Sequence, residues 1–211
     1  MIYLIITTSI NNRYGVQDAN DRRDRYLYAI SETLKVLPES IKPIIVENNG
    51  ERSTYLDNFI TNTLGKVPVV YTDNNKIQFK SKGANEILDI KTVIEKYNIS
   101  DDDIIIKLTG RYRIISSHFF EEVINNQTNY DAFVKFFGTC SLQFEKYDCI
   151  LGCYAIQAKY IKLYNHTYMD NYKSAEIAFA RYVRFCGANV KEIIKMDLEC
   201  CFAEDKRILI V

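Results

Sequence analysis

The sequence has no excess of charge of either sign, because its 27 lysines and arginines are matched by 27 aspartates and glutamates. A neutral chain has no overall field that attracts nucleic acid or an anionic membrane, so we expect neither as a partner. Glycine (8) and proline (3) are also scarce, in a chain of 211 residues of which 47% are hydrophobic. This composition excludes a linker-rich or disordered chain and predicts one packed domain over residues 1–211.

Long apolar runs and processing signals are missing as well. The amino-terminal apolar run ends at Thr7 and no basic segment precedes it, so we expect neither a signal peptide nor a membrane span. The six cysteines form no Cys-x-x-Cys pair and no array with the spacing of a zinc site. We therefore expect reduced thiols and a cytoplasmic location.

Over the first 115 residues, the hydrophobic pattern alternates between strand and helix. Continuous aliphatic runs predict buried strands, and apolar residues three or four positions apart predict helices. The predicted strands are 2–7, 43–46, 67–71 and 103–108, and the predicted helices are 22–37, 55–64 and 86–97. This order predicts right-handed crossovers and a parallel sheet with helices on both faces.

After residue 115 the alternation weakens. We expect strands at 131–137 and 149–155, helices at 118–125 and 174–186, and a short terminal strand at 208–211. Together the two halves predict a single-domain α/β fold with a central, mostly parallel six-stranded sheet flanked by helices.

Polar residues follow each strand predicted in the first half, and in an open parallel sheet the ligand binds outside the carboxyl ends of the strands. Lysine or arginine occurs in three of the four segments that continue from these strands: Arg13 after the first, Lys80 and Lys82 after the third, and Arg111 after the fourth. We therefore expect this edge to suit a nucleoside with phosphates. The polar stretches are Thr7-Thr8-Ser9, Glu47-Asn48-Asn49-Gly50, Thr72-Asp73-Asn74-Asn75 and Lys107-Leu108-Thr109-Gly110-Arg111.

Several well-known signatures are missing from the sequence. No GxxxxGK[ST] and no GxGxxG occurs, which argues against a P-loop enzyme and a dinucleotide-binding domain. No HExxH or GxSxG occurs either, so the corresponding hydrolases are disfavoured.

The opening strand and three further segments together resemble small GT-A-type glycosyltransferases, in particular those with which large DNA viruses of algae glycosylate their capsid protein. The three segments are IIVENNG at 44–50, SKGANEILDI at 81–90 and IIIKLTGRYRI at 104–114. The resemblance implies a GT-A-like fold, a UDP-hexose donor such as UDP-glucose or a UDP-deoxyhexose, and Mn²⁺ or Mg²⁺. It also implies a glycan or capsid glycoprotein as acceptor, with the host cytoplasm as location if the chain is viral. Residues 1–115 would bind the nucleotide sugar and residues 116–211 the acceptor.

The strand ends and the segment before the third helix supply the candidate donor-binding residues. Arginine and lysine there suit the diphosphate, because they donate charge-assisted hydrogen bonds to phosphate oxygens. Lys107 lies in an apolar strand and must pair or reach the ligand, because an unpaired buried ammonium is costly. Gly110 lets the backbone approach a ligand closely. The full set is Thr7, Thr8, Arg13, Glu47, Asn48, Asn49, Lys82, Gly83, Asn85, Lys107, Thr109, Gly110 and Arg111.

The sequence departs from the family pattern at the expected metal-binding motif. GT-A enzymes commonly have Asp-x-Asp at the end of the fourth strand, where this chain has Lys107-Leu108-Thr109-Gly110-Arg111. Cations could neutralise the diphosphate instead. If a metal binds, its ligands must come from elsewhere, and the candidates are Asp73 and Asp205, with Glu204 beside them.

A carboxylate in the second half is expected to act on the acceptor. In an inverting glycosyltransferase, one carboxylate removes the proton of the acceptor hydroxyl. Glu176, at the start of a predicted helix, is the first candidate for this catalytic residue and Asp205 the second. An acidic residue in a first helical turn is also favoured by the helix dipole alone.

Tyrosines of the second half are candidates for stacking on the acceptor sugar. Tyr160, Tyr164, Tyr168 and Tyr172 recur every four residues and would lie on one helical face. Packing of this stripe and a sugar-binding platform both remain open. The candidate acceptor-binding residues are Tyr154, Tyr168 and Tyr172.

Two other functions stay open. A nucleotidyltransferase that makes the sugar nucleotide usually has a glycine-rich loop after its first strand, whereas residues 7–21 contain only Gly15. A non-catalytic module that binds a nucleotide sugar is consistent with the missing Asp-x-Asp.

Overall fold

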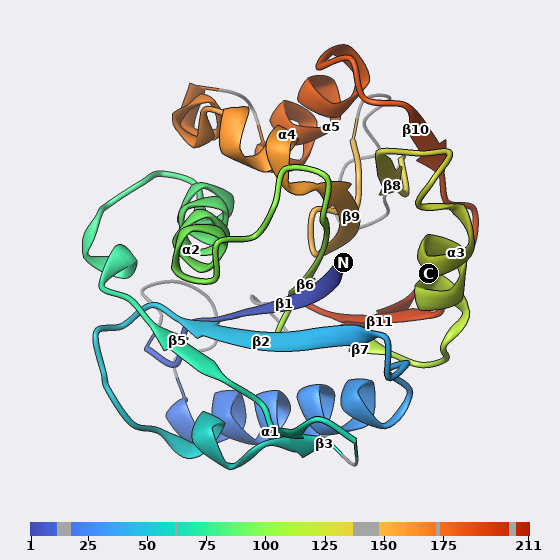
Figure 1. Ribbon diagram of the computed structural model, residues 1–211. Coiled ribbons are helices and arrows are strands. Elements are labelled where there is room, and N and C mark those ends of the chain that lie inside the picture. Colours follow the sequence, from blue (N-terminus) through green and yellow to red (C-terminus); the bar gives the residue numbers. More distant parts are fainter. Residues whose placement is uncertain (12–17, 62, 137–147, 172–173, 203–205) are drawn as a thin grey trace.

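The structure is a computed structural model that describes residues 1–11, 18–61, 63–136, 148–171, 174–202 and 206–211. Its main sheet is built from β1 (Ile2–Thr8), β2 (Ile41–Glu47), β5 (Val69–Tyr71), β6 (Ile104–Thr109), β8 (Ala132–Val134), β9 (Cys153–Gln157) and β10 (Val190–Glu192) (Figure 1). The strand order is β10-β8-β9-β6-β1-β2-β5. The predicted α/β fold with a mostly parallel sheet is confirmed, with seven strands instead of six.

The register of the central strands brings three carboxyl ends to one edge of the sheet. β1 is parallel to both β2 and β6. Thr8 lies opposite Glu47 of β2, and Thr7 lies opposite Thr109 of β6. The polar residues predicted to follow these strands are therefore neighbours.

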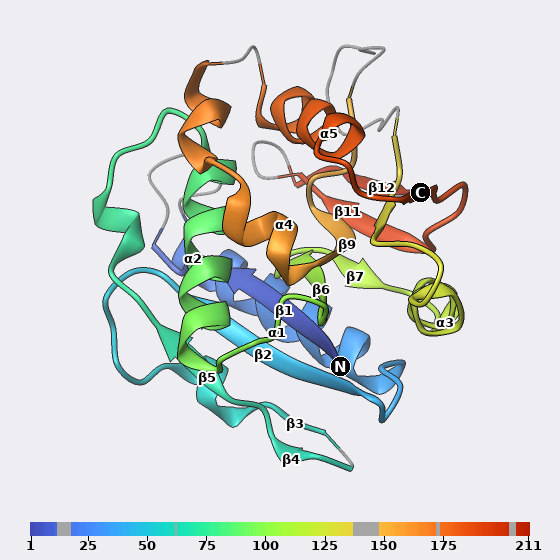
Figure 2. The same ribbon diagram turned by 45° about the horizontal axis from the view of Figure 1, so that its top comes forward.

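Helices cover both faces of the sheet, as predicted. The helices are α1 (Ala19–Lys35), α2 (Lys82–Lys96), α3 (His118–Asn126), α4 (Ala158–Leu163) and α5 (Ala175–Phe185). α1 lies on one face, and α2, α4 and α5 lie on the other (Figures 1 and 2). Leu4 and Ile6 of β1 join the buried cluster that contains α1 residues, whereas Tyr3 and Ile5 join the cluster of α2 and α5. In the part of the chain that the structure describes, no helix is long and apolar enough to cross a membrane.

Side-chain caps fix where three of these helices begin. The Asp18 carboxylate accepts hydrogen bonds from two backbone N–H groups of the first turn of α1. Ser81 accepts from the Gly83 N–H before α2, and Ser174 accepts from the Ile177 N–H before α5. Each cap satisfies donors that the helix itself leaves free.

Smaller elements complete the fold. A three-stranded sheet contains β7 (Arg113–Ile114), β11 (Leu198–Cys201) and β12 (Ile208–Ile210), and a hairpin contains β3 (Ile60–Thr61) and β4 (Gly65–Lys66). Short 3₁₀ helices are η1 (Tyr55–Asn58), η2 (Asn74–Lys76) and η3 (His166–Asn171). The predicted terminal strand therefore exists, but it belongs to the smaller sheet.

The predicted helix at 55–64 is wrong. Among the described residues of this segment only η1 is helical, and β3 and β4 of the hairpin follow it. Ile60, which the helical spacing placed with the buried residues, is 72% exposed. Gly65 has a φ of 73°, a left-handed conformation that ends any regular helix and suits a tight hairpin.

The strands of the second half also differ from expectation. The predicted strand 149–155 begins only at Cys153, and β9 runs antiparallel to both β6 and β8. The edge strand β10 has no counterpart in the prediction, because its Val-Lys-Glu sequence carries no strand periodicity.

Candidate functional site

The carboxyl ends of β1, β2 and β6 open into a hollow that we call the strand-end pocket. Of the candidate donor-binding residues, six line this pocket: Thr7, Thr8, Asn48, Lys82, Asn85 and Arg111. Ser9, Arg22, Tyr26, Asn75 and Glu86 complete the lining. Ligand binding at the carboxyl ends of parallel strands is the rule for open α/β sheets.

Glu47 supports the loops beside this pocket instead of lining it. Its buried carboxylate accepts hydrogen bonds from the Thr8 hydroxyl (2.6 Å), the Ile10 N–H (3.2 Å) and the Asn49 amide (2.5 Å). Burial raises the pKa of Glu47, and these hydrogen bonds partly offset the rise. Glu47 and Asn49 thus join the segment after β1 to the segment after β2.

A second buried carboxylate, Asp89 of α2, holds the ends of β2 and β5. It accepts hydrogen bonds from the side chains of Asn48 (2.8 Å), Thr72 (3.0 Å) and Asn74 (2.7 Å). Burial raises the pKa of Asp89 to about 7 against the lowering effect of these donors. Asn85, one helical turn earlier, donates to the backbone carbonyl of Asn74 (2.8 Å). Asn48 and Asn85, two of the residues predicted to bind the nucleotide sugar, are therefore held in place by this network.

An ion pair occupies the end of β6, where the resemblance places an acidic motif. The Lys107 ammonium, 1% exposed, donates to the Glu86 carboxylate (2.7 Å), the Thr109 hydroxyl (2.6 Å) and the carbonyl of Leu151 (2.9 Å). Lys107 is thus paired, as the sequence required. Burial alone would raise the pKa of Glu86, but Lys107 and the nearby Arg111 hold it below its ordinary value.

A second hollow, the α5 pocket, adjoins the strand-end pocket at Lys82, Glu86 and Arg111, which line both. Its other lining residues are Lys80, Ser81, Gly83, Thr109, Tyr112, Leu151, Gly152, Ala175, Glu176 and Phe202. It therefore contains the predicted catalytic residue Glu176 together with two more candidate donor-binding residues.

Glu176 is an ionisable group in an unfavourable environment for charge. Burial raises its pKa, the nearby carboxylates of Asp148 and Glu86 raise it further, and hydrogen bonds from its own backbone and from Ser174 offset part of the rise. A carboxylate with a raised pKa is a stronger base near neutral pH.

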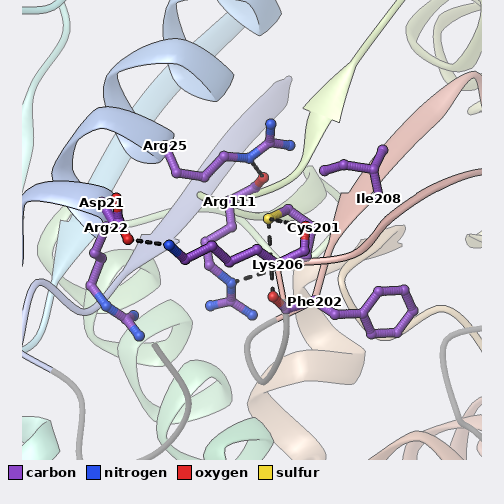
Figure 3. A pocket seen from close by; sticks show the side chains of 8 residues that line it. All are labelled: Asp21, Arg22, Arg25, Arg111, Cys201, Phe202, Lys206 and Ile208. Atoms are coloured by element: carbon purple, nitrogen blue, oxygen red, sulfur yellow. Dashed lines mark hydrogen bonds and ion pairs between the residues drawn. The ribbon is translucent and has the colours of Figure 1, made fainter. Parts of the chain in front are cut away.

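A third hollow, the arginine pocket, lies on the other side of Arg111. Its lining residues are Asp21, Arg22, Arg25, Arg111, Cys201, Phe202, Lys206 and Ile208 (Figure 3). Arg25 donates to the backbone carbonyl of Arg111 (2.8 Å) and pairs with Glu199 (2.9 Å), while Lys206 pairs with Asp21. Arg111 thus lines all three pockets, and a neighbouring residue fixes its backbone.

Two of the predicted glycines serve packing between elements. A Cβ on Gly110 would lie 2.8 Å from a methyl group of Thr8 and 3.0 Å from the Tyr26 ring. A Cβ on Gly83 would lie 2.8 Å from the Cβ of Ala175. Gly110 therefore permits close approach of protein to protein, in contrast to the predicted approach of a ligand.

Of the two alternatives for the tyrosine stripe, the described tyrosines favour packing over a sugar-binding platform. Tyr154 has no exposed surface and packs on Phe179, with ring centroids 4.4 Å apart, so it is not accessible to an acceptor. Tyr160 and Tyr164 are buried in the same core cluster, and α4 ends at Leu163, so the stripe does not continue along one helix. Tyr168 is 55% exposed but lines none of the three pockets.

Four of the predicted residues, Arg13, Tyr172, Glu204 and Asp205, lie outside the described residues. The proposed roles of Arg13 in donor binding, Tyr172 in acceptor binding and Asp205 in catalysis or metal binding remain predictions.

The described residues do not fit a divalent cation at the strand ends. Asp73 is half-exposed, pairs with Lys76 (2.7 Å) and lines none of the three pockets. No three acidic, histidine or cysteine side chains are grouped to hold a metal in the part of the chain that the structure describes. At the end of β6, the guanidinium of Arg111 lines the pockets and repels a cation, and the Glu86 carboxylate beside it is already paired with Lys107.

Several solved structures have a fold similar to that of this chain. No protein-family model matches the chain, and no curated protein matches its sequence. Among solved structures, a Desulfovibrio desulfuricans protein described as a nucleotide-diphospho-sugar transferase is similar, with a TM-score of 0.56, 9% identity, and coverage of 91% of this chain and 79% of that one. The galactosyltransferase LgtC, solved with donor and acceptor sugar analogues, has a TM-score of 0.56, 9% identity, and coverage of 90% and 73%.

A third similar structure is 4-diphosphocytidyl-2C-methyl-D-erythritol synthase from Anaerococcus prevotii. Its TM-score is 0.51 at 12% identity, with coverage of 91% of this chain and 86% of that one. At such low identity these likenesses show the fold alone. The chain therefore shares the α/β fold of these three structures.

Proposed function

We propose that the chain is a glycosyltransferase that moves a hexose from a UDP-sugar, such as UDP-glucose or a UDP-deoxyhexose, to a hydroxyl group of a glycan or glycoprotein. The observation that carries this proposal is the junction at Lys82 and Arg111. These two cations stand between a polar pocket at the strand ends and a pocket that contains Glu176. A diphosphate between them would have its nucleoside on one side and its sugar facing the acceptor on the other.

The chemistry assigned to these residues is an inverting transfer. The acceptor oxygen bonds to the anomeric carbon of the hexose, and the bond from that carbon to the diphosphate oxygen breaks. The acceptor proton passes to the Glu176 carboxylate, whose raised pKa suits it to this role. Negative charge grows on the leaving UDP, and Arg111 and Lys82 stabilise that charge.

The proposed acceptor is a glycoprotein. The sequence resemblance to glycosyltransferases of algal viruses favours a viral capsid glycoprotein.

A thermal-shift series tests the donor class. UDP, UDP-glucose, UDP-rhamnose, GDP-mannose and CMP would be added to the purified protein in EDTA and again with manganese. A ligand at a hundredfold excess over its dissociation constant stabilises the folded state by about 2.7 kcal/mol, which raises the melting temperature of a chain of this size by roughly 5 to 10 °C. We expect this rise for UDP-sugars in EDTA as well as with manganese. No shift with any nucleotide or nucleotide sugar would contradict the proposal.

A nucleotidyltransferase is the second candidate, because the fold is shared with a synthase of a diphosphocytidyl compound. The products separate the two activities. A glycosyltransferase releases UDP from UDP-glucose, and the release rises with acceptor. A nucleotidyltransferase consumes UTP and a sugar 1-phosphate and releases pyrophosphate. Binding of UDP-glucose with neither product would indicate a non-catalytic module.

A further inference from the structure

Glu86 stands at the junction of the strand-end pocket and the α5 pocket, a position that the sequence analysis did not single out. Only Lys82 and Arg111 share this position with it among the residues described. Its side chain is 24% exposed, whereas its partner Lys107 is almost completely buried. The exposed part of the Glu86 side chain therefore belongs to the lining that the two pockets share, together with two cations.

Three side chains of β1 and β6 hold the Glu86 carboxylate in place. Oε1 accepts hydrogen bonds from the hydroxyl groups of Thr7 (3.2 Å) and Thr109 (3.1 Å), and Oε2 accepts from the Lys107 ammonium (2.7 Å). A carboxylate oxygen can accept two hydrogen bonds, and Lys107 is the one donor to Oε2 among the described residues. Oε2 thus retains the capacity to accept one more.

The charge of this group determines what it can bind. Despite burial, Lys107 and Arg111 keep the pKa of Glu86 below its ordinary value, so the group is a carboxylate at neutral pH and only accepts hydrogen bonds. Such a group repels phosphate oxygens and binds hydroxyl groups. Lys107 neutralises it, which allows a diphosphate to bind at Lys82 and Arg111 close by.

We propose that Glu86 recognises the sugar that is transferred, with Oε2 accepting a hydrogen bond from one hydroxyl group of the hexose. The inference rests on the proposed function, because it takes the strand-end pocket as the nucleoside site and the α5 pocket as the acceptor site. The hexose is bonded to the diphosphate held by Lys82 and Arg111 and must face the acceptor, so it lies on the α5-pocket side of these two cations, where Glu86 is also part of the lining. Glu86 therefore makes the donor site selective for a hexose that carries this hydroxyl, and a nucleotide without sugar does not use it.

The experiment measures dissociation constants by calorimetry for UDP, UDP-glucose and the four UDP-glucose analogues that lack the 2-, 3-, 4- or 6-hydroxyl. The proteins are the wild type, Glu86→Ala, and Glu86→Met combined with Lys107→Met. The double variant avoids leaving the Lys107 ammonium buried without a partner. Glu95→Ala is the matched control, because Glu95 is an exposed glutamate on the same helix.

We expect the wild type to bind one deoxy analogue roughly 10- to 100-fold more weakly than UDP-glucose, the range for a lost hydrogen bond to a charged group. In both Glu86 variants, that analogue and UDP-glucose should bind equally, while the affinity for UDP changes less than about threefold. Glu95→Ala should behave as the wild type.

Three outcomes would overturn the inference. An equal loss of affinity for UDP and UDP-glucose in both variants would assign Glu86 a purely structural role. If the Glu86 variants still bind the same deoxy analogue more weakly than UDP-glucose, another residue recognises that hydroxyl. If the wild type binds all four deoxy analogues as tightly as UDP-glucose, no hydroxyl is recognised. In each of these cases UDP-glucose still binds and the proposed function stands. Absence of binding of every nucleotide and nucleotide sugar to the wild type would instead reject both.

Discussion

Arg111 has a double role that its place in the chain explains. It follows the buried strand β6, so its backbone is anchored by the sheet and by the hydrogen bond from Arg25 (2.8 Å). Its side chain remains half-buried and reaches the meeting point of the three pockets. A guanidinium held in this way offers a preorganised fork of donors to a diphosphate.

Arg111→Ala should therefore weaken binding of UDP-glucose roughly 10- to 100-fold, the effect of losing hydrogen bonds to a charged group. The anchoring contact is preserved, because Arg25 bonds to the backbone carbonyl. Arg23→Ala is the control, since Arg23 is exposed and pairs only with Asp24 among the described residues. Calorimetric dissociation constants check the prediction, and equal values for the two variants would remove Arg111 from the donor site.

Glu176→Gln should reduce glycosyl transfer by about 10²- to 10⁴-fold, because an amide cannot take the acceptor proton. The dissociation constant for the donor should change little. In the parent protein, transfer should fall as the pH drops through the raised pKa of Glu176, since the protonated group is no base. Rates at saturating donor and acceptor across pH measure both effects. A Gln variant within a few-fold of the parent would redirect the search to Asp205.

The candidate site was predictable from sequence where polar residues end an apolar strand. Thr7, Thr8 and Arg111 follow this rule and line the strand-end pocket. Glu86 and Asp89 were not found, because both lie inside a segment that matches an amphipathic helix. The sequence did contain a signal for Glu86. A buried Lys107 needs an acidic partner, and Glu86 and Asp89 are acidic residues three positions apart on one predicted helix.

At the scale of elements, the carboxylate of Asp89 joins α2 to the ends of β2 and β5. Its pKa is about 7 in the folded protein and near the ordinary 3.8 when the chain unfolds. The folded state binds more protons between these values, so the free energy of unfolding falls as the pH rises from about 4 to 7.

Asp89→Asn should remove this titration. As the pH rises from about 4 to 7, the free energy of unfolding of the wild type should fall relative to that of the variant, by up to about 1.4 kcal/mol per pH unit. Urea denaturation at pH 5, 6 and 7 measures it. A difference that stays constant with pH would show that Asp89 is ionised in both states.

The contact of α2 with α5 depends on Gly83. A methyl group there would lie 2.8 Å from the Cβ of Ala175, closer than such atoms approach. Gly83→Ala should destabilise the protein by roughly 1 to 3 kcal/mol despite the higher helix propensity of alanine. Adding Ala175→Gly should restore part of the loss, and failure of this rescue would place the strain elsewhere. Thermal denaturation of the wild type and both variants checks the result.

The fold was predictable from sequence where a segment has a single, unambiguous hydrophobic pattern. β1, β2 and β6 are continuous aliphatic strands buried on both faces, so their type and order follow from sequence. Residues 55–64 place apolar side chains at helical spacing, yet Gly65 and the hairpin determine the outcome. The antiparallel direction of β9 depends on tertiary pairing, which no local pattern encodes.

The whole molecule concentrates its charge locally while its formal net charge is zero. Cations gather where the three pockets meet, and acidic partners such as Glu199 and Asp21 hold several of them in place. A small anionic ligand is thus attracted at short range without the general affinity for polyanions that a basic protein has.

The base of that ligand should be a pyrimidine. The strand-end pocket is bordered by short polar side chains, including Thr7, Ser9 and Asn75, which suit a small base with several hydrogen-bonding groups. We therefore expect UDP to raise the melting temperature of the protein more than GDP or ADP at equal concentration. At concentrations well above the dissociation constants, a tenfold preference in affinity corresponds to about 1.4 kcal/mol, or roughly 3 to 5 °C in a chain of this length. All three nucleotides carry the same diphosphate, so the difference in shift measures the base alone, and equal stabilisation by GDP would contradict the assignment.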